Sequence, residues 1–432
     1  EAGTALFGEI RVLSGPSALP PVSTYTPGNR LVAAYYDKPF FPENFNAPSG
    51  EDKATGRTLD DWEKFYEGGR RLTEYLKHVG YNAAIISVAR DGSTIYPSQL
   101  LEPTLRYDNG GLFFTGQDPR RKDVLEMLFR QFDRQGLKLI PAIHFATPLP
   151  ELESRLATLG PDGVGIDLLE VDHKGISRLA RHLARQGLAP YYNPLDSRVQ
   201  AAMKRVLTEL TNRYAHHPSF GGLCLQLGAN TFTQLPDQNW ALDDKTITRF
   251  AAETKIEMPT NGPRRFADRA RLLNSTSREP WLNWRSKVLA NLYQEFQIDL
   301  TDRRPDANLY LATGELLESW PVREEMRPRL PHHGDFSQAM LRHGIVPSLL
   351  AEDSNIVLLR GRRQAPLTSL ASQSVNVNVN ESPAVDEFFA SAGNVGALNF
   401  HESQPQRLPE FEAVSPFGAA KTRTRFESHF SA

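Results

Sequence analysis

The chain has 432 residues, of which 40% are hydrophobic and 23% are charged, so it can bury a large core and is too apolar to be disordered. Its 49 basic and 51 acidic residues leave a formal net charge of -2, which provides no overall field to attract nucleic acid or an acidic membrane. No run of about eighteen apolar residues suggests a membrane-spanning helix, and the single cysteine excludes an internal disulfide.

Residues 1–28 are predicted to stand apart from the main domain, residues 29–432. A short strand-like stretch at residues 7–13 precedes the Pro- and Ser-rich residues 15–21, which are typical of a linker. We interpret this part as a strand and linker at the end of an accessory β region. The chain start lacks the features of a signal peptide, but a chain with a removed export signal would begin in the same way. The compartment is left open, with a periplasmic or secreted location favoured.

The main domain begins with a strand–helix unit. Residues 31–36 form an apolar run of the β type, and residues 59–79 carry apolar side chains at helical spacing. Gly80 stands where a left-handed helix cap is expected, and Gly136 stands in the same place after the next helix, residues 120–135. The unit is then repeated along the chain.

Strand-like runs and helices alternate up to residue 400, with an excursion around residues 160–190 that we expect to form an insertion. The predicted strands are residues 31–36, 82–88, 137–144, 221–227, 308–313, 355–359, 374–379 and 396–400. The later predicted helices are residues 197–214, 243–254 and 280–296. The run at residues 374–379 alternates in polarity, so a hairpin outside the sheet is its alternative. The pattern predicts an α/β fold, a (β/α)8 TIM barrel with long strand-end loops. A doubly wound sheet is the rival, but it lacks a Gly-x-Gly-x-x-Gly turn.

Four segments carry a resemblance to a known group of proteins. They are Asn193-Pro194 and residues 281–285, 37–42 and 399–402. In these segments the chain resembles bacterial family-10-like glycosyl hydrolases, over about residues 31–401. The resemblance implies a TIM barrel with a carbohydrate cleft at the carboxyl ends of its strands. In the retaining barrel glycosidases the fourth strand ends in Asn-Glu, which supplies the acid/base, whereas residues 226–230 here read Gln-Leu-Gly-Ala-Asn.

Active sites of such barrels lie at the carboxyl ends of the strands, so polar residues just after each apolar run are the candidates. In chain order they are Asp37, Lys38, Arg90, Asp91, His144, Gln226, Asn230, Glu315, Arg360, Arg362, His401 and Glu402. Glycoside hydrolysis requires one protonated and one ionised carboxyl group. Glu315 and Glu402 are predicted to be this catalytic pair, because each closely follows a strongly apolar strand. The alternative for either residue is an ion pair with an arginine at the barrel rim.

The other candidates are assigned to substrate binding. They are Asp37, Lys38, Asp91, His144, Gln226, Asn230, Arg360 and His401. Most have a structural alternative: Asp91 lies in an Asp-Gly sequence typical of turns, and Asp37-Lys38 suits a salt-bridged loop. Arg360 suits either an anionic sugar or an ion pair at the strand end.

No cofactor and no metal site are predicted. The pairs His216-His217 and His332-His333 are adjacent, so they cannot share a helix face as zinc ligands four residues apart would. Cys224 is interpreted as a small buried hydrophobe. The leading hypothesis is a glycoside hydrolase acting on a poly- or oligosaccharide, without a nucleic-acid or membrane partner and of undetermined oligomeric state. A non-catalytic carbohydrate-binding barrel that has lost its acid/base is the alternative.

Overall fold

The structure is a computed structural model, and part of the chain is described by it. The described residues are 31–40, 45, 50–51, 58–59, 62–78, 80–90, 93–101, 122–159, 168–181, 191–317, 319–326, 335–351, 353–363, 383–400 and 424–428. The expected strands at residues 7–13 and 374–379 lie outside this part, as do Asp91, His401 and Glu402.

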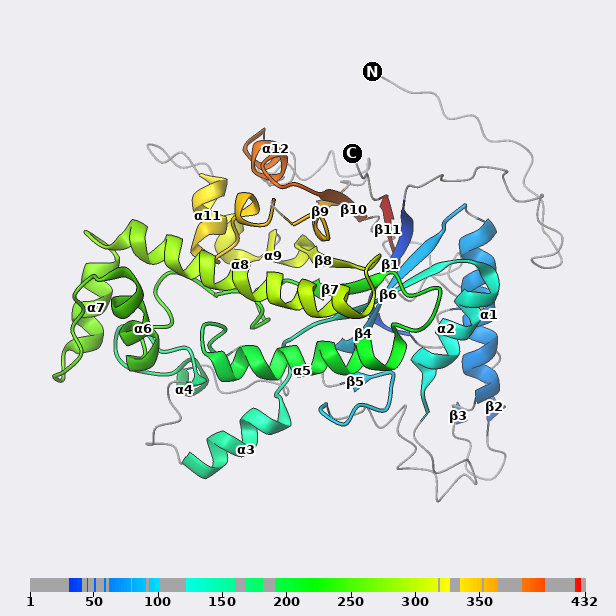
Figure 1. The fold of residues 1–432 in the computed structure, drawn as a ribbon, viewed down its shortest axis with the longest axis horizontal. Coiled ribbons are helices and arrows are strands. Elements are labelled where there is room, and N and C mark those ends of the chain that lie inside the picture. The colour runs from blue at the N-terminus through cyan, green and yellow to red at the C-terminus, as the bar shows by residue number, and fades with distance from the viewer. Residues whose placement is uncertain are drawn as a thin grey trace, which may run out of the picture.

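Among the described residues, seven parallel strands form a curled sheet at the centre of the structure (Figure 1). In spatial order they are β1 (Val32–Pro39), β4 (Ala83–Arg90), β6 (Lys138–Ile143), β7 (Gly222–Gln226), β8 (Asn308–Ala312), β9 (Ile356–Arg363) and β10 (Val395–Phe400). Spatial neighbours follow one another in the chain, as repeated strand–helix–strand units require. All seven lie where the sequence predicts a strand.

A short strand near the end of the chain joins the two edges of the parallel sheet. β11 (Thr424–Ser428) pairs antiparallel with both β1 and β10. The (β/α)8 barrel expected from the sequence is therefore confirmed only in part: the described residues form a curled sheet of seven parallel strands with helices, and the strand that links its edges is antiparallel. The remaining strands are β2 (Gly50–Glu51), β3 (Thr58–Leu59) and β5 (Ser93–Thr94).

Helices surround the sheet, and several extend beyond it (Figure 1). They are α1 (Trp62–His78), α2 (Val124–Gln135), α3 (Pro150–Leu159), α4 (Arg178–Arg181), α5 (Ser197–Tyr214), α6 (Asp244–Thr254), α7 (Arg265–Leu273), α8 (Arg278–Arg303), α9 (Gly314–Leu317), α10 (Trp320–Glu325), α11 (Phe336–Arg342), the 3-10 helix η6 (Pro347–Leu349) and α12 (Pro383–Ala390). Figure 1 shows α6 and α7 beside the N-terminal half of α8, beyond the sheet. None of the described helices has the length and hydrophobicity of a membrane span.

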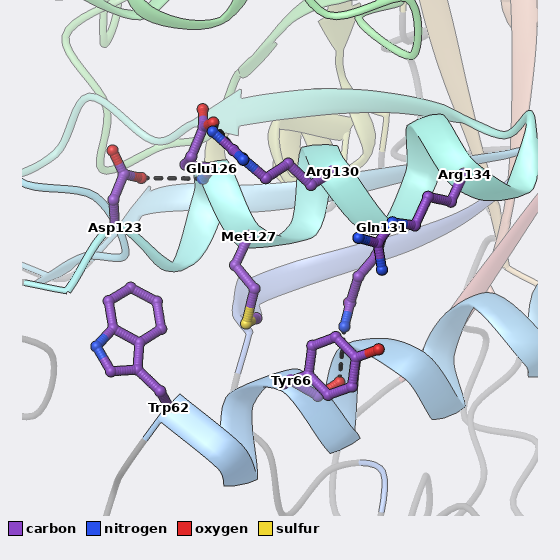
Figure 2. A pocket seen from close by; sticks show the side chains of 8 residues that line it. All are labelled: Trp62, Tyr66, Asp123, Glu126, Met127, Arg130, Gln131 and Arg134. Atoms are coloured by element: carbon purple, nitrogen blue, oxygen red, sulfur yellow. Dashed lines mark hydrogen bonds and ion pairs between the residues drawn. The ribbon is translucent and has the colours of Figure 1, made fainter.

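Local sequence explains the limits of α2. The side chain of Asp123 accepts a hydrogen bond of 2.9 Å from the backbone N–H of Glu126, which caps the first turn (Figure 2). Gly136 ends the helix at φ 66°, and its N–H donates to the last carbonyls. Gly80, after α1, has φ 79°. The left-handed caps predicted from the sequence are therefore present.

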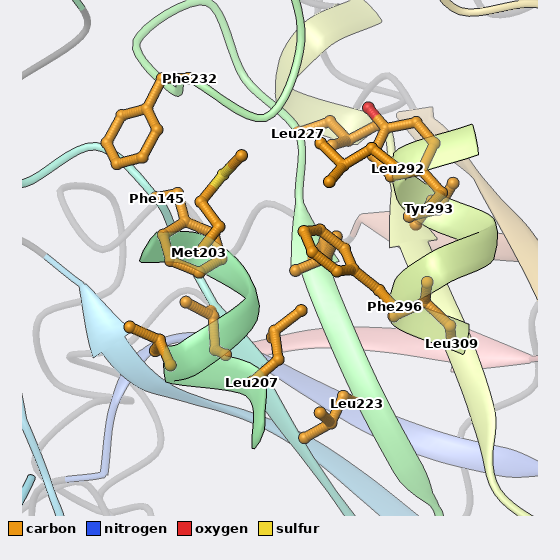
Figure 3. Packing of buried hydrophobic residues seen from close by; sticks show 14 of the residues in the cluster. Phe145, Met203, Leu207, Leu223, Leu227, Phe232, Leu292, Tyr293, Phe296 and Leu309 are labelled. Carbon is orange, nitrogen blue, oxygen red and sulfur yellow. The ribbon is translucent and has the colours of Figure 1, made fainter. Parts of the chain in front are cut away.

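Two apolar cores lie on opposite faces of the strands, because successive side chains of a strand alternate in direction. The inner core of the curled sheet is made of Ala33, Tyr35, Ala83, Ile85, Ile140, Ala142, Cys224, Tyr310, Ala312, Val357 and Leu359. The larger outer core lies between the sheet and the helices. Figure 3 shows Met203 and Leu207 of α5, Phe296 of α8 and Leu223 of β7, which all belong to this outer core. Burial of each such side chain contributes roughly 1.5–3 kcal/mol to the free energy of folding.

Candidate active site

Glu315 lies in the first turn of α9, directly after β8, and meets residues from two other strand ends. Arg90, the last residue of β4, donates from Nη1 to Oε1 of Glu315 at 2.9 Å. His144 follows β6, and its Nε2 lies 3.5 Å from Oε2 of Glu315. The ends of β4, β6 and β8 therefore bring together three polar side chains that the sequence selects separately.

The charges around Glu315 keep it ionised. Burial by itself raises the pKa of Glu315, but the His144 ring and the Arg90 guanidinium outweigh it and lower the pKa to about 2. The side chain retains 25% exposure. A carboxylate held in this form accepts a proton or attacks an electrophile, and it cannot act as a proton donor near neutral pH.

The His144 ring faces Glu315 through Nε2. Among the described residues no hydrogen-bond partner reaches its buried Nδ1, whereas Nε2 faces the Glu315 carboxylate, which can only accept. Nε2 therefore carries a proton in this contact.

Deeper in the curled sheet, Gln226 of β7 is held by two hydroxyl groups. Its Nε2 donates to Oη of Tyr35 in β1 at 2.7 Å, and Oγ of Ser87 in β4 donates to its Oε1 at 3.3 Å. The Gln226 side chain is 1% exposed. The amide predicted to bind substrate thus joins β7 to β1 and β4 below the strand ends.

The segment after β7 approaches Glu315 closely. A Cβ atom placed on Gly228 would lie 3.0 Å from Oε2 and 3.3 Å from Cβ of Glu315. The carbonyl of Gly228 also accepts from Oγ1 of Thr231 at 2.9 Å and from Nε2 of Gln234. These buried contacts hold the backbone of residues 228–234 in place. Asn230, which lies between Gly228 and Thr231 in the sequence, is exposed.

Arg360 points to the helices. Leu359 belongs to the inner core, so its neighbour Arg360 faces outward. There Arg360 pairs with Asp386 of α12 and lies over the Phe389 ring, 5.6 Å from its centroid. The structure thus does not bring Arg360 to Glu315. Asp37 and Lys38 lie near the end of β1, and their roles stay predictions.

Sequence reasoning missed Gly228 and Ser87 as parts of this region. A glycine just after the fourth parallel strand is a signal for close approach of another group, and Gly228 is such a residue. Ser87 carried no comparable signal, because a hydroxyl inside an apolar run becomes meaningful only once its partner across the sheet is known.

A separate surface pocket of about 310 Å³ lies between α1 and α2. It is lined by Trp62, Tyr66, Asp123, Glu126, Met127, Arg130, Gln131 and Arg134 (Figure 2). The Nε2 atom of Gln131 donates to the Tyr66 carbonyl at 2.7 Å and ties the two helices together. Its lining belongs to helices on the outside of the sheet, so this pocket is distinct from the Glu315 group.

No known family profile matches the sequence, and no curated protein matches it. Among solved structures, the catalytic domain of a β-amylase from Paenibacillus polymyxa covers 89% of this chain and 89% of its own, at 12% identity and a TM-score of 0.48. A β-galactosidase from the psychrophilic Marinomonas ef1 covers 69% of this chain, at 14% identity and a TM-score of 0.38. A catalytic mutant of Gan42B, a GH42 β-galactosidase from G. stearothermophilus, covers 66%, at 13% identity and a TM-score of 0.34.

All three of these proteins are glycoside hydrolases, and none is a family-10-like protein by name. This chain spans 42% of the first β-galactosidase and 36% of the second. With TM-scores of 0.34–0.48, the likenesses assign neither a family nor an activity to the chain.

Proposed function

We propose that this protein is a glycoside hydrolase built on a variant of the (β/α)8 barrel, with Glu315 as its ionised catalytic carboxylate. The observation that carries the proposal is the group at the strand ends, where Arg90 and His144 hold a largely buried Glu315 in its charged form. Barrel enzymes place their reacting groups at this edge of the sheet. Hydrolysis of a glycosidic bond uses such a carboxylate as the nucleophile or as the base that activates water.

The acid of the proposed pair must be a second group. A carboxyl whose pKa is about 2 is unprotonated near neutral pH, so Glu315 cannot protonate the leaving oxygen. We assign that role to Glu402, which follows β10 by two residues in the sequence. His401, Asp37, Lys38, Asp91 and Asn230 are proposed to bind sugar hydroxyls. For Arg360, the ion pair with Asp386 supports the structural alternative.

The second candidate function is a carbohydrate-binding barrel without catalysis. The region after the fourth parallel strand favours it, because Gln226 stands where the retaining barrel glycosidases carry Asn-Glu, and its amide is engaged by Tyr35 and Ser87. In this case the Glu315 group would bind a sugar hydroxyl or a cationic substituent. We place both functions on the same edge of the sheet.

Hydrolysis of a panel of neutral and anionic glycans separates the two functions. We expect the wild type to cleave at least one glycan, and Glu315→Gln and Glu402→Gln to lower kcat/KM at least about a hundredfold, the scale of general acid–base catalysis. Glu279→Gln is the matched control, since Glu279 is exposed on α8. Cleavage that survives Glu315→Gln contradicts the assignment, and glycan binding without cleavage supports the binding barrel.

The anomeric configuration of the sugar first released by the wild type separates the two roles of Glu315. If Glu315 is the nucleophile, a covalent glycosyl-enzyme forms and water then hydrolyses it, so the product retains the configuration of the substrate. If Glu315 is instead a base for water, a single displacement inverts the configuration. NMR of the product at early times therefore decides between a retaining and an inverting reaction.

A further inference from the structure

A second group of chemically versatile side chains lies on the outside of the sheet, where α2 meets the turn after α5. His217, in that turn, is 5% exposed and stacks on the Phe129 ring, with centroids 4.9 Å apart. Its Nδ1 lies 2.7 Å from Oδ2 of Asp133, and its Nε2 lies 2.9 Å from Oε2 of Glu126. Both ring nitrogens thus face carboxylate oxygens.

This arrangement requires a positive species between His217 and Glu126. Carboxylates accept hydrogen bonds and cannot donate them, so a neutral ring protonated on Nδ1 leaves two acceptors facing each other at Nε2 and Glu126. Either a second proton or a metal ion must lie in that contact. A ring nitrogen that donates to a carboxylate while the other faces a metal is the usual arrangement of a histidine ligand.

His216 places a third possible metal ligand beside this contact. One ligand atom each of Glu126, His216 and His217 lies within 4.8 Å of the others. His216 is exposed, and the centroids of the two imidazole rings are 4.1 Å apart. The supporting contacts are in place: the N–H of Ser219 donates to Asp133, and Nε of Arg130 donates to the other oxygen of Glu126 at 2.7 Å (Figure 2).

We propose that Glu126, His216 and His217 bind a divalent transition metal ion, with Asp133 as the residue that orients His217. Two imidazoles and one carboxylate are ligands that zinc accepts, and three protein ligands leave one position for water. The ion would join α2 to a turn that is 91 residues away in the chain. The site is separate from Glu315, so its test does not depend on the proposed hydrolase activity.

Zinc titration of the full chain after treatment with a chelator tests the proposal. We expect the wild type to take up one Zn²⁺ per chain by calorimetry, and His216→Ala to bind at least tenfold more weakly. Because His216 is exposed, this change leaves the fold intact. The matched control is His173→Ala, an exposed histidine in another part of the described chain, which should bind as the wild type does.

The orienting role of Asp133 has its own readout. Asp133→Asn should weaken zinc binding by roughly 10–100-fold, the usual effect of removing such a partner of a ligand. With Co²⁺ in place of zinc, the wild type should show visible absorption of a nitrogen- and oxygen-bound ion, and His217→Gln should lose it. Absence of zinc uptake by the wild type, or uptake that His216→Ala leaves unchanged, overturns the proposal.

Discussion

Glu315 keeps its charge in surroundings where burial alone would remove it. The guanidinium of Arg90 and the ring of His144 approach different oxygens of the carboxylate, so each stabilises the ionised form. This stabilisation is also a contribution to folding, because the carboxyl has no such partners in the unfolded chain. The pH dependence of stability therefore reports on the site without knowledge of a substrate.

We predict that the stability difference between the wild type and Glu315→Gln depends on pH. The pKa of Glu315 is lower in the folded protein, at about 2 against an ordinary 4.5, so its contribution is present above pH 4.5 and is lost as the pH falls toward 2. Between pH 6 and 4 the difference should shrink by about 1 kcal/mol. Urea unfolding at several pH values measures it, with Glu279→Gln as the control. A difference that is constant with pH would show that the pKa is not lowered.

Gly228→Ala should damage the site more than the fold. The new methyl would meet Oε2 of Glu315 at 3.0 Å, so the carboxylate must shift by several tenths of an ångström. We expect kcat/KM on a cleaved glycan to fall at least about tenfold, since small displacements of reacting groups are costly. Gly221→Ala is the control, because its methyl meets Ile140 at the same 3.0 Å but at the start of the strand. Equal losses in both variants would contradict a specific role for Gly228.

The sequence could select Glu315, His144 and Arg90, because each polar side chain follows a buried apolar run. It could not show that the three touch, since that depends on the spatial order of β4, β6 and β8. The cluster around His217 was missed for a related reason. Its partners are 84 and 91 residues away, and the argument from helical spacing does not apply to the turn in which His216 and His217 lie.

At the scale of elements, two glycines have positive φ for different reasons. One needs only the backbone conformation, and the other also has no space for a side chain. Gly136 has φ 66°, and a Cβ there would meet no atom within 4 Å. Gly222, at the start of β7, has φ 129°, and a Cβ there would lie 2.0 Å from the carbonyl oxygen of Asn308 in β8. Gly136 is required only for its left-handed backbone conformation. At Gly222 a side chain would also collide with the backbone of β8.

We therefore predict unequal effects of alanine at these two positions. Gly136→Ala should lower the free energy of unfolding by about 1–2 kcal/mol, the cost of the left-handed conformation. Gly222→Ala should cost considerably more or prevent folding, because β7 and β8 would have to separate. Chemical unfolding compares them, and Gly136→Asn, which tolerates positive φ better, should recover part of the loss. Similar losses at both positions would contradict the close approach at Gly222.

The parallel strands were predictable because strands buried on both faces read as continuous apolar runs. β11 was not, because its sequence, Thr-Arg-Phe-Glu-Ser, lacks such a run. Pairing with two neighbours holds this strand in place, and pairing partners are a property of the whole chain. An antiparallel strand that lies last in the sequence also breaks the strand–helix repeat on which the prediction relied.

At the scale of the whole molecule, β11 joins the first parallel strand to the last. Its backbone register places Phe426 opposite Ala34 of β1 and Asn399 of β10. A chain ending at residue 423 would leave both partners with unpaired backbone groups, which favours association between molecules. We predict lower thermal stability, faster amide exchange in β1 and β10, and concentration-dependent aggregation. Hydrogen exchange and light scattering measure these effects, and unchanged exchange in both strands would contradict the joining role.

The inner core of the curled sheet contains the one cysteine of the sequence, Cys224, which is fully buried. No thiol reagent can reach it unless the strands part, so its alkylation rate gives the fraction of molecules that are open at any moment. The alkylation rate of Cys224 thus measures how often the sheet opens. Because no other thiol competes, ligands, metal ions and substitutions can be compared by how far each of them lowers that rate.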